Sequence, residues 1–219
     1  TMTRPDVSEE RKRQILHAAA QVFDRRGIEA ARMEEIAQEA NLSVGGVYWY
    51  FKSKDAIIHA LLDKMFNADL DGLHALLVAE GSVRDRLITY AREELATARS
   101  PLRSELYNLA TRSDSACAQV LEYLNELKRL LAALIQQGID RNELRPLDPV
   151  TAAQTLMAAY EGFAELAMLG FTLSDPERDL LAMLDLILDG MSQPPKPATT
   201  TTVSTPVFSS DEWQAATQP

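Results

Sequence analysis

Two short helical patterns, joined by a tight polar turn, fill residues 32–54, and a long apolar pattern follows them directly. The first pattern has an apolar face at positions i, i+3, i+4 and i+7, formed by Met33, Ile36, Ala37 and Ala40. Asn41 comes next, and asparagine tolerates the left-handed conformation that ends a helix. Ser43 suits the N-cap of the second helix, because its hydroxyl can accept a free backbone amide. A helix that stops and restarts over so short a turn predicts a helix-turn-helix.

The second helix of this motif, roughly residues 44–51, has two contrasting faces at about 100° of rotation per residue. One arc is expected to pack inward and contains Val44, Val47, Tyr50 and Phe51. The opposite arc is expected to face outward and contains Gly45, Gly46, Tyr48 and Trp49. Two large aromatic residues beside two glycines make an unusual solvent face, so this arc is predicted to contact a partner.

DNA is the partner that the outward arc favours. Each glycine costs a helix about 1 kcal/mol relative to alanine, but the missing side chains let a phosphate backbone approach closely. Tyr48 can donate its hydroxyl to a phosphate, and Trp49 can lie against a thymine methyl group or a sugar. Alternatively, the glycines form a loop and the aromatic residues belong to the core. The segment alone fits both interpretations, and the flanking helical patterns favour the helix-turn-helix.

The residues in and around this motif resemble the DNA-binding head of the tetracycline-repressor (TetR) family of bacterial transcription regulators. The matching positions are Ile15, Ala18, Ala19, Phe23, Gly27, Met33, Ile36, Ala37, Ala40, Ser43, Gly45, Tyr48, Tyr50, Phe51, Lys54 and Ala56. They span roughly residues 9–66, and the Y-x-Y-F-x-x-K run at residues 48–54 is the most specific part. The resemblance implies DNA contacts from Ser43, Gly45, Gly46, Tyr48 and Trp49. It also implies that Lys54 holds a phosphate at the start of the next helix.

Two places depart from the family pattern. Ala31 and Arg32 stand where the family usually has Thr or Ser, so Arg32 is predicted to supply charge in place of a hydroxyl. Val44 replaces a residue that is commonly basic or polar, which removes one contact. We expect both changes to alter operator preference. The predicted DNA-contact set is Arg32, Ser43, Val44, Gly45, Gly46, Tyr48, Trp49 and Lys54.

The overall charge of −10 at first argues against DNA binding, because phosphates repel an acidic protein. The first 60 residues, however, carry nine Lys or Arg and nine Asp or Glu, so all the excess acid lies outside them. Basic residues gather at the N-terminal arm and around the motif, at Arg4, Arg11, Lys12, Arg13, Arg32, Lys52 and Lys54. A neutral head with local basic groups favours specific binding of moderate strength. Solubility is an alternative role for residues 11–13.

Other classes of function find little support in the sequence. The single cysteine, Cys117, allows no internal disulfide and favours a reducing cytoplasm. We find no signal-peptide pattern and no run of about 18 apolar residues, so neither export nor a membrane partner is predicted. His17, His59 and His74 are scattered, so no metal or other cofactor is expected. No paired nucleophile and base or phosphate-binding glycine loop is visible, so an enzyme is not predicted.

Helical patterns cover the rest of the chain to about residue 191, and strand patterns are essentially absent. We therefore predict an all-α protein of about nine helices, with breaks near residues 27, 80–82, 100–101, 138–149 and 174–176. Three parts are expected. They are a helix-turn-helix DNA-binding domain at residues 8–53, a helical ligand-binding and dimerisation domain at 54–192, and a Pro/Thr-rich tail at 193–219.

The last two predicted helices are apolar over more than the single stripe that one core contact needs. A partner is the favoured explanation, and the resemblance implies the same, because the family dimerises through its last two helices as a four-helix bundle. The predicted interface is Leu156, Tyr160, Phe163, Ala167, Leu180, Leu184, Ile187 and Leu188. A homodimer would present two heads to half-sites about 34–36 Å apart, or a multiple of that spacing, on double-stranded DNA.

The resemblance implies a pocket for a small-molecule effector in the middle helices. Its candidate walls are Met65, Phe66, Tyr90, Leu106, Tyr107, Tyr123, Met157, Tyr160 and Phe163. Each of these residues taken singly is better explained as ordinary core. Together, aromatic and Met-rich walls would suit an apolar or amphipathic ligand.

The function expected from the resemblance is a transcriptional regulator, usually a repressor, that a small and largely apolar ligand releases from a pseudo-palindromic operator. The alternative is a helical ligand-binding or scaffold protein whose head no longer binds DNA specifically. The tail is expected to be flexible, because Pro- and Thr-rich sequence buries no core. Phe208 and Trp213 are its candidate anchors onto the body or a partner subunit, and a crystal contact is the alternative.

Overall fold

The computed structural model describes residues 7–98, 101–171 and 175–192, and within these ranges the regular secondary structure is entirely α-helical. The predicted all-α fold class is therefore confirmed. The described helices are α1 (Val7–Arg26), α2 (Met33–Glu39), α3 (Val44–Tyr50), α4 (Lys54–Val78), α5 (Val83–Ala98), α6 (Pro101–Ala110), α7 (Asp114–Asp140), α8 (Pro149–Met168) and α9 (Pro176–Ser192). The predicted tail and its anchors Phe208 and Trp213 lie outside the described residues.

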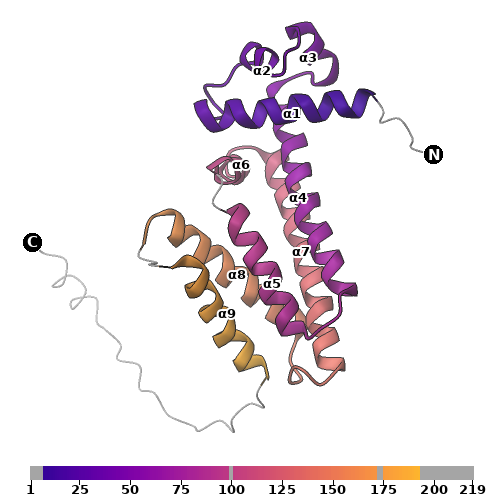
Figure 1. Ribbon diagram of the computed structural model, residues 1–219, viewed down its shortest axis with the longest axis vertical. Helices are drawn as coiled ribbons and strands as arrows, with labels where there is room; N and C mark the ends of the chain where they lie inside the picture. The colour runs from indigo at the N-terminus through magenta and orange to yellow at the C-terminus, as the bar shows by residue number, and fades with distance from the viewer. Residues whose placement is uncertain (1–6, 99–100, 172–174, 193–219) are drawn as a thin grey trace, which may run out of the picture.

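Local capping chemistry shapes the first three helices as the sequence predicts. Gly27 ends α1 with a φ of +76°, and Asn41 follows α2 with a φ of +53°. Both values lie in the left-handed region that glycine and asparagine tolerate. The hydroxyl of Ser43 accepts the amide of Gly46 at 3.0 Å and so caps α3. These caps place α2 and α3 on the outer side of α1, at the top of Figure 1.

Two long helices, α4 and α7, run side by side and form the spine of the body (Figure 1). The buried face of α7 carries Tyr123, Leu127, Leu130 and Leu134, and α8 packs against this helix as well. Gly138 does not end α7 as predicted, because the helix continues to Asp140. A Cβ atom there would lie 2.8 Å from Leu144 Cδ1, so this glycine is needed for close packing of the following turn.

The C-terminal end of α4 is held by a buried arginine. Arg86 is only 3% exposed, and its Nη1 donates to Leu76 O at 2.7 Å and to Gln137 Oε1 at 3.1 Å. Gln137 of α7 in turn donates its Nε2 to Leu77 O at 3.0 Å. Burial lowers the pKa of Arg86, but a guanidinium stays charged in proteins and complements the negative end of the α4 dipole. The far end of α4 is thus fastened to both α5 and α7.

Four residues predicted to contact a second copy are instead buried within one protomer. Leu180 and Leu188 of α9 are 0% exposed, and Leu156 and Leu184 are about as inaccessible. Because α9 packs against both α5 and α8, the wide apolar surface of this helix covers the protein's own core. The interface prediction was wrong for these four leucines.

No described helix is both long enough and apolar enough to cross a membrane.

Candidate nucleic-acid interface and ligand pocket

The outward face of α3 carries two aromatic side chains that the core does not cover. Trp49 is 77% exposed and Tyr48 is 41% exposed, whereas Val47, the residue just before them, is fully buried. A Cβ atom at Gly45 would meet no atom within 4 Å, so the backbone there is open to a partner. Gly46 has less room, because its Cβ atom would lie 3.2 Å from the Ser43 hydroxyl. The helical face predicted from the sequence is the face that the structure exposes.

The flanking residues of the predicted contact set differ in how they are placed. Arg32 is exposed at the start of α2, where its backbone amide donates to Glu35 Oε2 at 3.1 Å. Val44 is partly buried and packs against the core, in keeping with its apolar side chain. Ser43 uses its hydroxyl to cap α3, as described above. Arg32 and Ser43 are both exposed, and Arg32 is the one of the two that carries a charge.

Lys52 completes the surface around α3, although the predicted contact set did not include it. Its ammonium nitrogen lies 5.8 Å from the centre of the Trp49 ring, within range of a cation–π interaction. The same nitrogen donates to Tyr48 O at 3.1 Å, close to the negative end of the α3 dipole. Lys52 thus steadies the exposed tryptophan and adds a positive charge beside it. The sequence could have indicated this role, because Lys52 follows Trp49 by about one helical turn.

Lys54 is engaged differently from the phosphate contact that the resemblance implies. Its ammonium nitrogen donates to the backbone carbonyls of Ile28, Glu29 and Ala31 at 2.6, 2.9 and 3.0 Å. A lysine ammonium has three donors, so these bonds account for all of them. In the described structure Lys54 fastens the connection between α1 and α2 to the first turn of α4. A phosphate contact by Lys54 stays a prediction, and it would require exchange of one of these bonds.

The helix α6 and the turn that follows it contact the same connection from the body. The carboxylate of Glu105 accepts the Ile28 amide at 2.9 Å, and Arg112 forms an ion pair with Glu29 at 3.1 Å. Farther along α4, His59 Nδ1 lies 2.6 Å from Gln119 Oε1 of α7. The head is therefore held by α4, α6 and the turn after α6, and α7 in turn holds the same part of α4.

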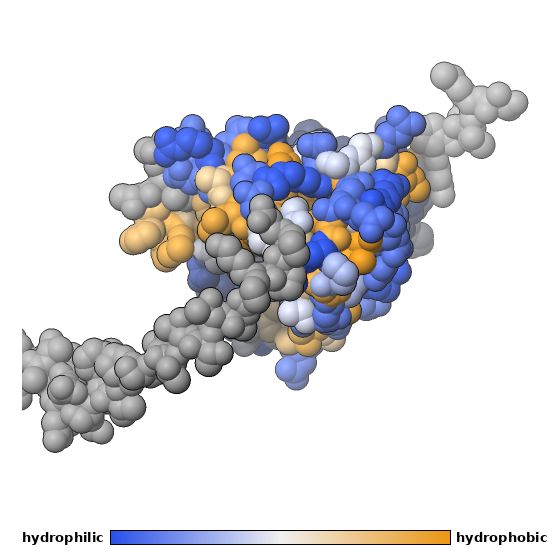
Figure 2. All heavy atoms as spheres, turned by 90° about the horizontal axis from the view of Figure 1, so that it is seen from below, coloured by the Kyte–Doolittle hydropathy of each residue, from blue (hydrophilic) through white to orange (hydrophobic). Residues whose placement is uncertain are grey.

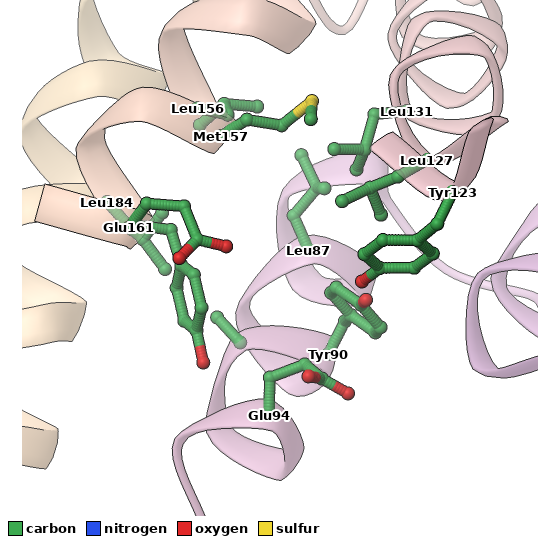
Figure 3. A pocket seen from close by; sticks show the side chains of 12 residues that line it. Leu87, Tyr90, Glu94, Tyr123, Leu127, Leu131, Leu156, Met157, Glu161 and Leu184 are labelled. Carbon is green, nitrogen blue, oxygen red and sulfur yellow. The ribbon is translucent and has the colours of Figure 1, made fainter. Parts of the chain in front are cut away.

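A cavity with mainly apolar walls lies among α5, α7, α8 and α9 (Figure 3). It encloses about 600 Å³ of empty space, including the part open to solvent. Its described lining residues are Leu87, Tyr90, Ala91, Glu94, Tyr123, Leu127, Leu131, Leu156, Met157, Tyr160, Glu161 and Leu184. An apolar and aromatic lining with a few polar groups is typical of a small-molecule site.

Four of the predicted pocket residues line this cavity, namely Tyr90, Tyr123, Met157 and Tyr160. The other predicted residues are packed in or against the core nearby and are not among its walls; they are Met65, Phe66, Leu106, Tyr107 and Phe163. Sequence analysis missed the leucines of α5 and α7, because a pocket-facing leucine and a core leucine follow the same helical spacing. It also missed Glu94 and Glu161.

The cavity wall is in direct contact with α4. Phe66 of α4 stacks on Tyr123 with ring centres 4.1 Å apart, and the Tyr123 hydroxyl donates to the buried carboxylate of Asp69 at 3.0 Å. One turn away, a Cβ atom on Gly72 would lie 3.6 Å from the Tyr90 ring. Two cavity tyrosines thus rest on one face of the helix whose first turn holds the head.

Comparison with known proteins agrees with this arrangement. Residues 15–61 match the family model of bacterial regulatory proteins of the tetR family, and residues 84–182 match that of the tetracyclin repressor-like C-terminal domain. The chain belongs to the TetR family. This assignment confirms the resemblance on which the sequence predictions relied.

TetR-family relatives and solved structures resemble most of the described chain. The HTH-type transcriptional regulator YfiR of Bacillus subtilis is 26% identical over 175 residues, which cover 75% of this chain and 85% of the relative. RutR of Escherichia coli is 28% identical over 161 residues, with 72% and 75% covered. A TetR transcription regulator from Haloarcula marismortui superposes with a TM-score of 0.74 at 19% identity, with 84% and 100% covered. The last comparison supports the fold.

Replacement of Gly45 by alanine is expected to weaken operator binding at least tenfold without lowering stability. The Cβ atom has open space in the free protein, and alanine favours a helix by about 1 kcal/mol. Fluorescence anisotropy with operator DNA and thermal unfolding provide the two readouts. Gly46→Ala is the contrast, since it crowds the Ser43 cap and is expected to lower stability as well. Wild-type affinity of the Gly45→Ala protein would contradict close backbone approach to DNA.

Replacement of Lys54 by alanine is expected to lower the free energy of unfolding by about 1.5–3 kcal/mol, because the carbonyls of the α1–α2 connection lose a charged donor. Guanidinium unfolding measures this change. Lys64→Ala, at an exposed position on the same helix, is the matched control and is expected to be neutral. Unchanged stability with weakened DNA binding would show that the phosphate role is the main one.

Proposed function

We propose that this TetR-family protein is a dimeric repressor that binds a pseudo-palindromic operator and releases it when a small, largely apolar ligand enters the cavity. The observation that carries the DNA-binding part is the outer face of α3, where exposed Trp49 and Tyr48 flank an open backbone at Gly45. Exposed aromatic side chains on a short helix do not contribute to the protein's own core, so a partner explains them better. In a helix-turn-helix, the same face enters the major groove.

Contacts to DNA are proposed for three kinds of group. Tyr48 and Arg32 are placed to reach phosphates, while Trp49 offers apolar surface to a base or a sugar. Lys52 adds a charge next to Trp49. Ser43 and Val44 serve mainly to set the angle of α3 through capping and packing.

Release of DNA is proposed to pass through α4. A ligand that pushes on Tyr90 or Tyr123 acts directly on the α4 face that contains Phe66, Asp69 and Gly72. Arg86 and Gln137 anchor the far end of this helix, so movement of its head-proximal end is proposed to exchange the contact between His59 and Gln119 of α7. The bonds from Lys54 to the α1–α2 connection then carry that movement to the head. A differential binding energy of about 1–3 kcal/mol is enough for a switch.

A second copy of this chain is proposed to cover the outer face of α8 and α9. Large apolar residues remain exposed there, with Leu166 at 46%, Leu169 at 77% and Leu186 at 76%. Gly162 and Gly190 lie one turn from Leu166 and Leu186, and a Cβ atom at either would meet nothing within 4 Å. Small residues of this kind allow close helix approach. Hydrophobic residues gather at the edge of Figure 2 on the side where α8 and α9 lie.

Operator binding is expected to depend steeply on salt, because each neutralised phosphate releases counterions. A site recovered by selection from a random DNA pool would serve as the probe, and its two half-sites are expected to be inverted repeats. Arg32→Ala is expected to reduce the salt slope by about one, while Arg92→Ala, on the body, leaves it unchanged. Failure to enrich any sequence would favour the alternative of a ligand-binding protein whose head no longer binds DNA.

Leu169→Glu and Leu186→Glu are expected to shift the protein from dimer to monomer, because a charge would be buried in the proposed interface. Sedimentation velocity at micromolar concentration measures the change. Leu121→Glu is the matched control, since this exposed leucine lies on α7, and the variant is expected to remain dimeric. A wild-type protein that sediments as a stable monomer would refute the dimer.

A further inference from the structure

The helix α3 lacks the side chains that usually read bases through paired hydrogen bonds. Arginine, lysine, asparagine and glutamine read purines in this way, and aspartate or glutamate can accept a hydrogen bond from cytosine. The seven residues of α3, Val44–Tyr50, are valine, glycine, tyrosine and tryptophan only. This composition removes the commonest form of direct base recognition from the helix that is proposed to enter the major groove.

Trp49 is the most exposed of the large side chains of α3. It is 77% exposed, whereas Val44 and Tyr50 are partly buried and pack against the core. Its indole N–H is a single donor, and adenine, guanine and thymine all offer an acceptor in the major groove, so this group discriminates little between bases. The rest of the indole is apolar, and the C5-methyl group of thymine is the apolar feature of that groove. Trp49 is thus suited to discriminate between bases by apolar contact.

Two neighbours of Trp49 favour such a contact. The ammonium nitrogen of Lys52 lies 5.8 Å from the centre of the Trp49 ring and donates to Tyr48 O at 3.1 Å, so it steadies the ring at the C-terminal end of α3. Gly45 lies one turn before Trp49 on the same face of the helix, and a Cβ atom there would meet nothing within 4 Å. A base edge therefore has room to approach the helix beside the indole.

We propose that this protein recognises a thymine in each half-site of its operator through the C5-methyl group, which packs against Trp49. The inference rests on the proposed DNA-binding function and deepens it, because it selects a base in place of a sugar as the partner of Trp49. Burial of one methyl group favours binding about fourfold, so two half-sites together are expected to give a preference of roughly fifteenfold for thymine over uracil.

Replacement of thymidine by deoxyuridine tests the methyl group alone, because uracil keeps the hydrogen-bonding groups of thymine and lacks its methyl group. The operator recovered by selection from a random DNA pool is the probe, and each thymine is replaced in turn at the equivalent position of both half-sites. Fluorescence anisotropy with the full-length protein is expected to identify a thymine whose replacement weakens binding by about fifteenfold.

Protein variants test whether that contact is made by Trp49. Trp49→Ala is expected to bind the thymine and uracil operators with equal affinity, whereas Trp49→Phe keeps an apolar ring and is expected to retain a preference for thymine. Tyr48→Phe is the matched control, because it removes a hydroxyl from the same exposed face and is expected to weaken binding of both operators by the same factor. A role of Trp49 in folding alone would not alter the preference between two DNA molecules.

The outcomes separate this inference from the proposed function. An enriched operator that binds equally well with uracil at every thymine would overturn the methyl contact, while specific DNA binding would stand. A thymine preference that Trp49→Ala retains in full would overturn the assignment to Trp49. Failure to enrich any operator would overturn both this inference and the proposed DNA binding. A preference that is lost in Trp49→Ala and kept in Trp49→Phe and Tyr48→Phe supports the proposal.

Discussion

The packing of α4 against two sets of partners is the constraint on which the described molecule depends. Its first turn grips the α1–α2 connection through Lys54, and its middle supports the tyrosines of the cavity through Phe66 and Asp69. One helix therefore contacts both the wall of the cavity and the connection between α1 and α2. The C-terminal end of the same helix is anchored to α5 and α7 through Arg86 and Gln137.

Charge is distributed along the chain in keeping with this division of roles. The first 60 residues are formally neutral, with Lys52 beside Trp49 on the outer face of α3, and the acidic excess lies in the remainder of the chain. Part of that acid, at Glu94 and Glu161, lines the cavity.

Prediction from sequence succeeded where the controlling physics is local. The cap at Ser43, the left-handed Asn41 and the inward Val47 each depend on residues within one or two turns, so spacing alone determines them. Prediction failed where the contacting residues are distant from one another in the sequence. Lys54 binds carbonyls more than twenty positions earlier in the chain, and no spacing rule connects a lysine to unsatisfied backbone groups at that distance. For the same reason, the sequence did not indicate that Glu94 and Glu161 line the cavity.

The apolar surface of α9 shows the boundary between the two sources of information. The sequence by itself determined that Leu180, Leu184 and Leu188 form a buried stripe. Their helical spacing places them on one face, and the hydrophobic effect favours removal of that face from water. Only the tertiary structure decided that α5 and α8 bury this stripe and that Leu186 is left outward. The hydrophobic effect is non-directional, so it requires that a surface be covered without specifying what covers it. That choice is made by the three-dimensional arrangement of all the helices together.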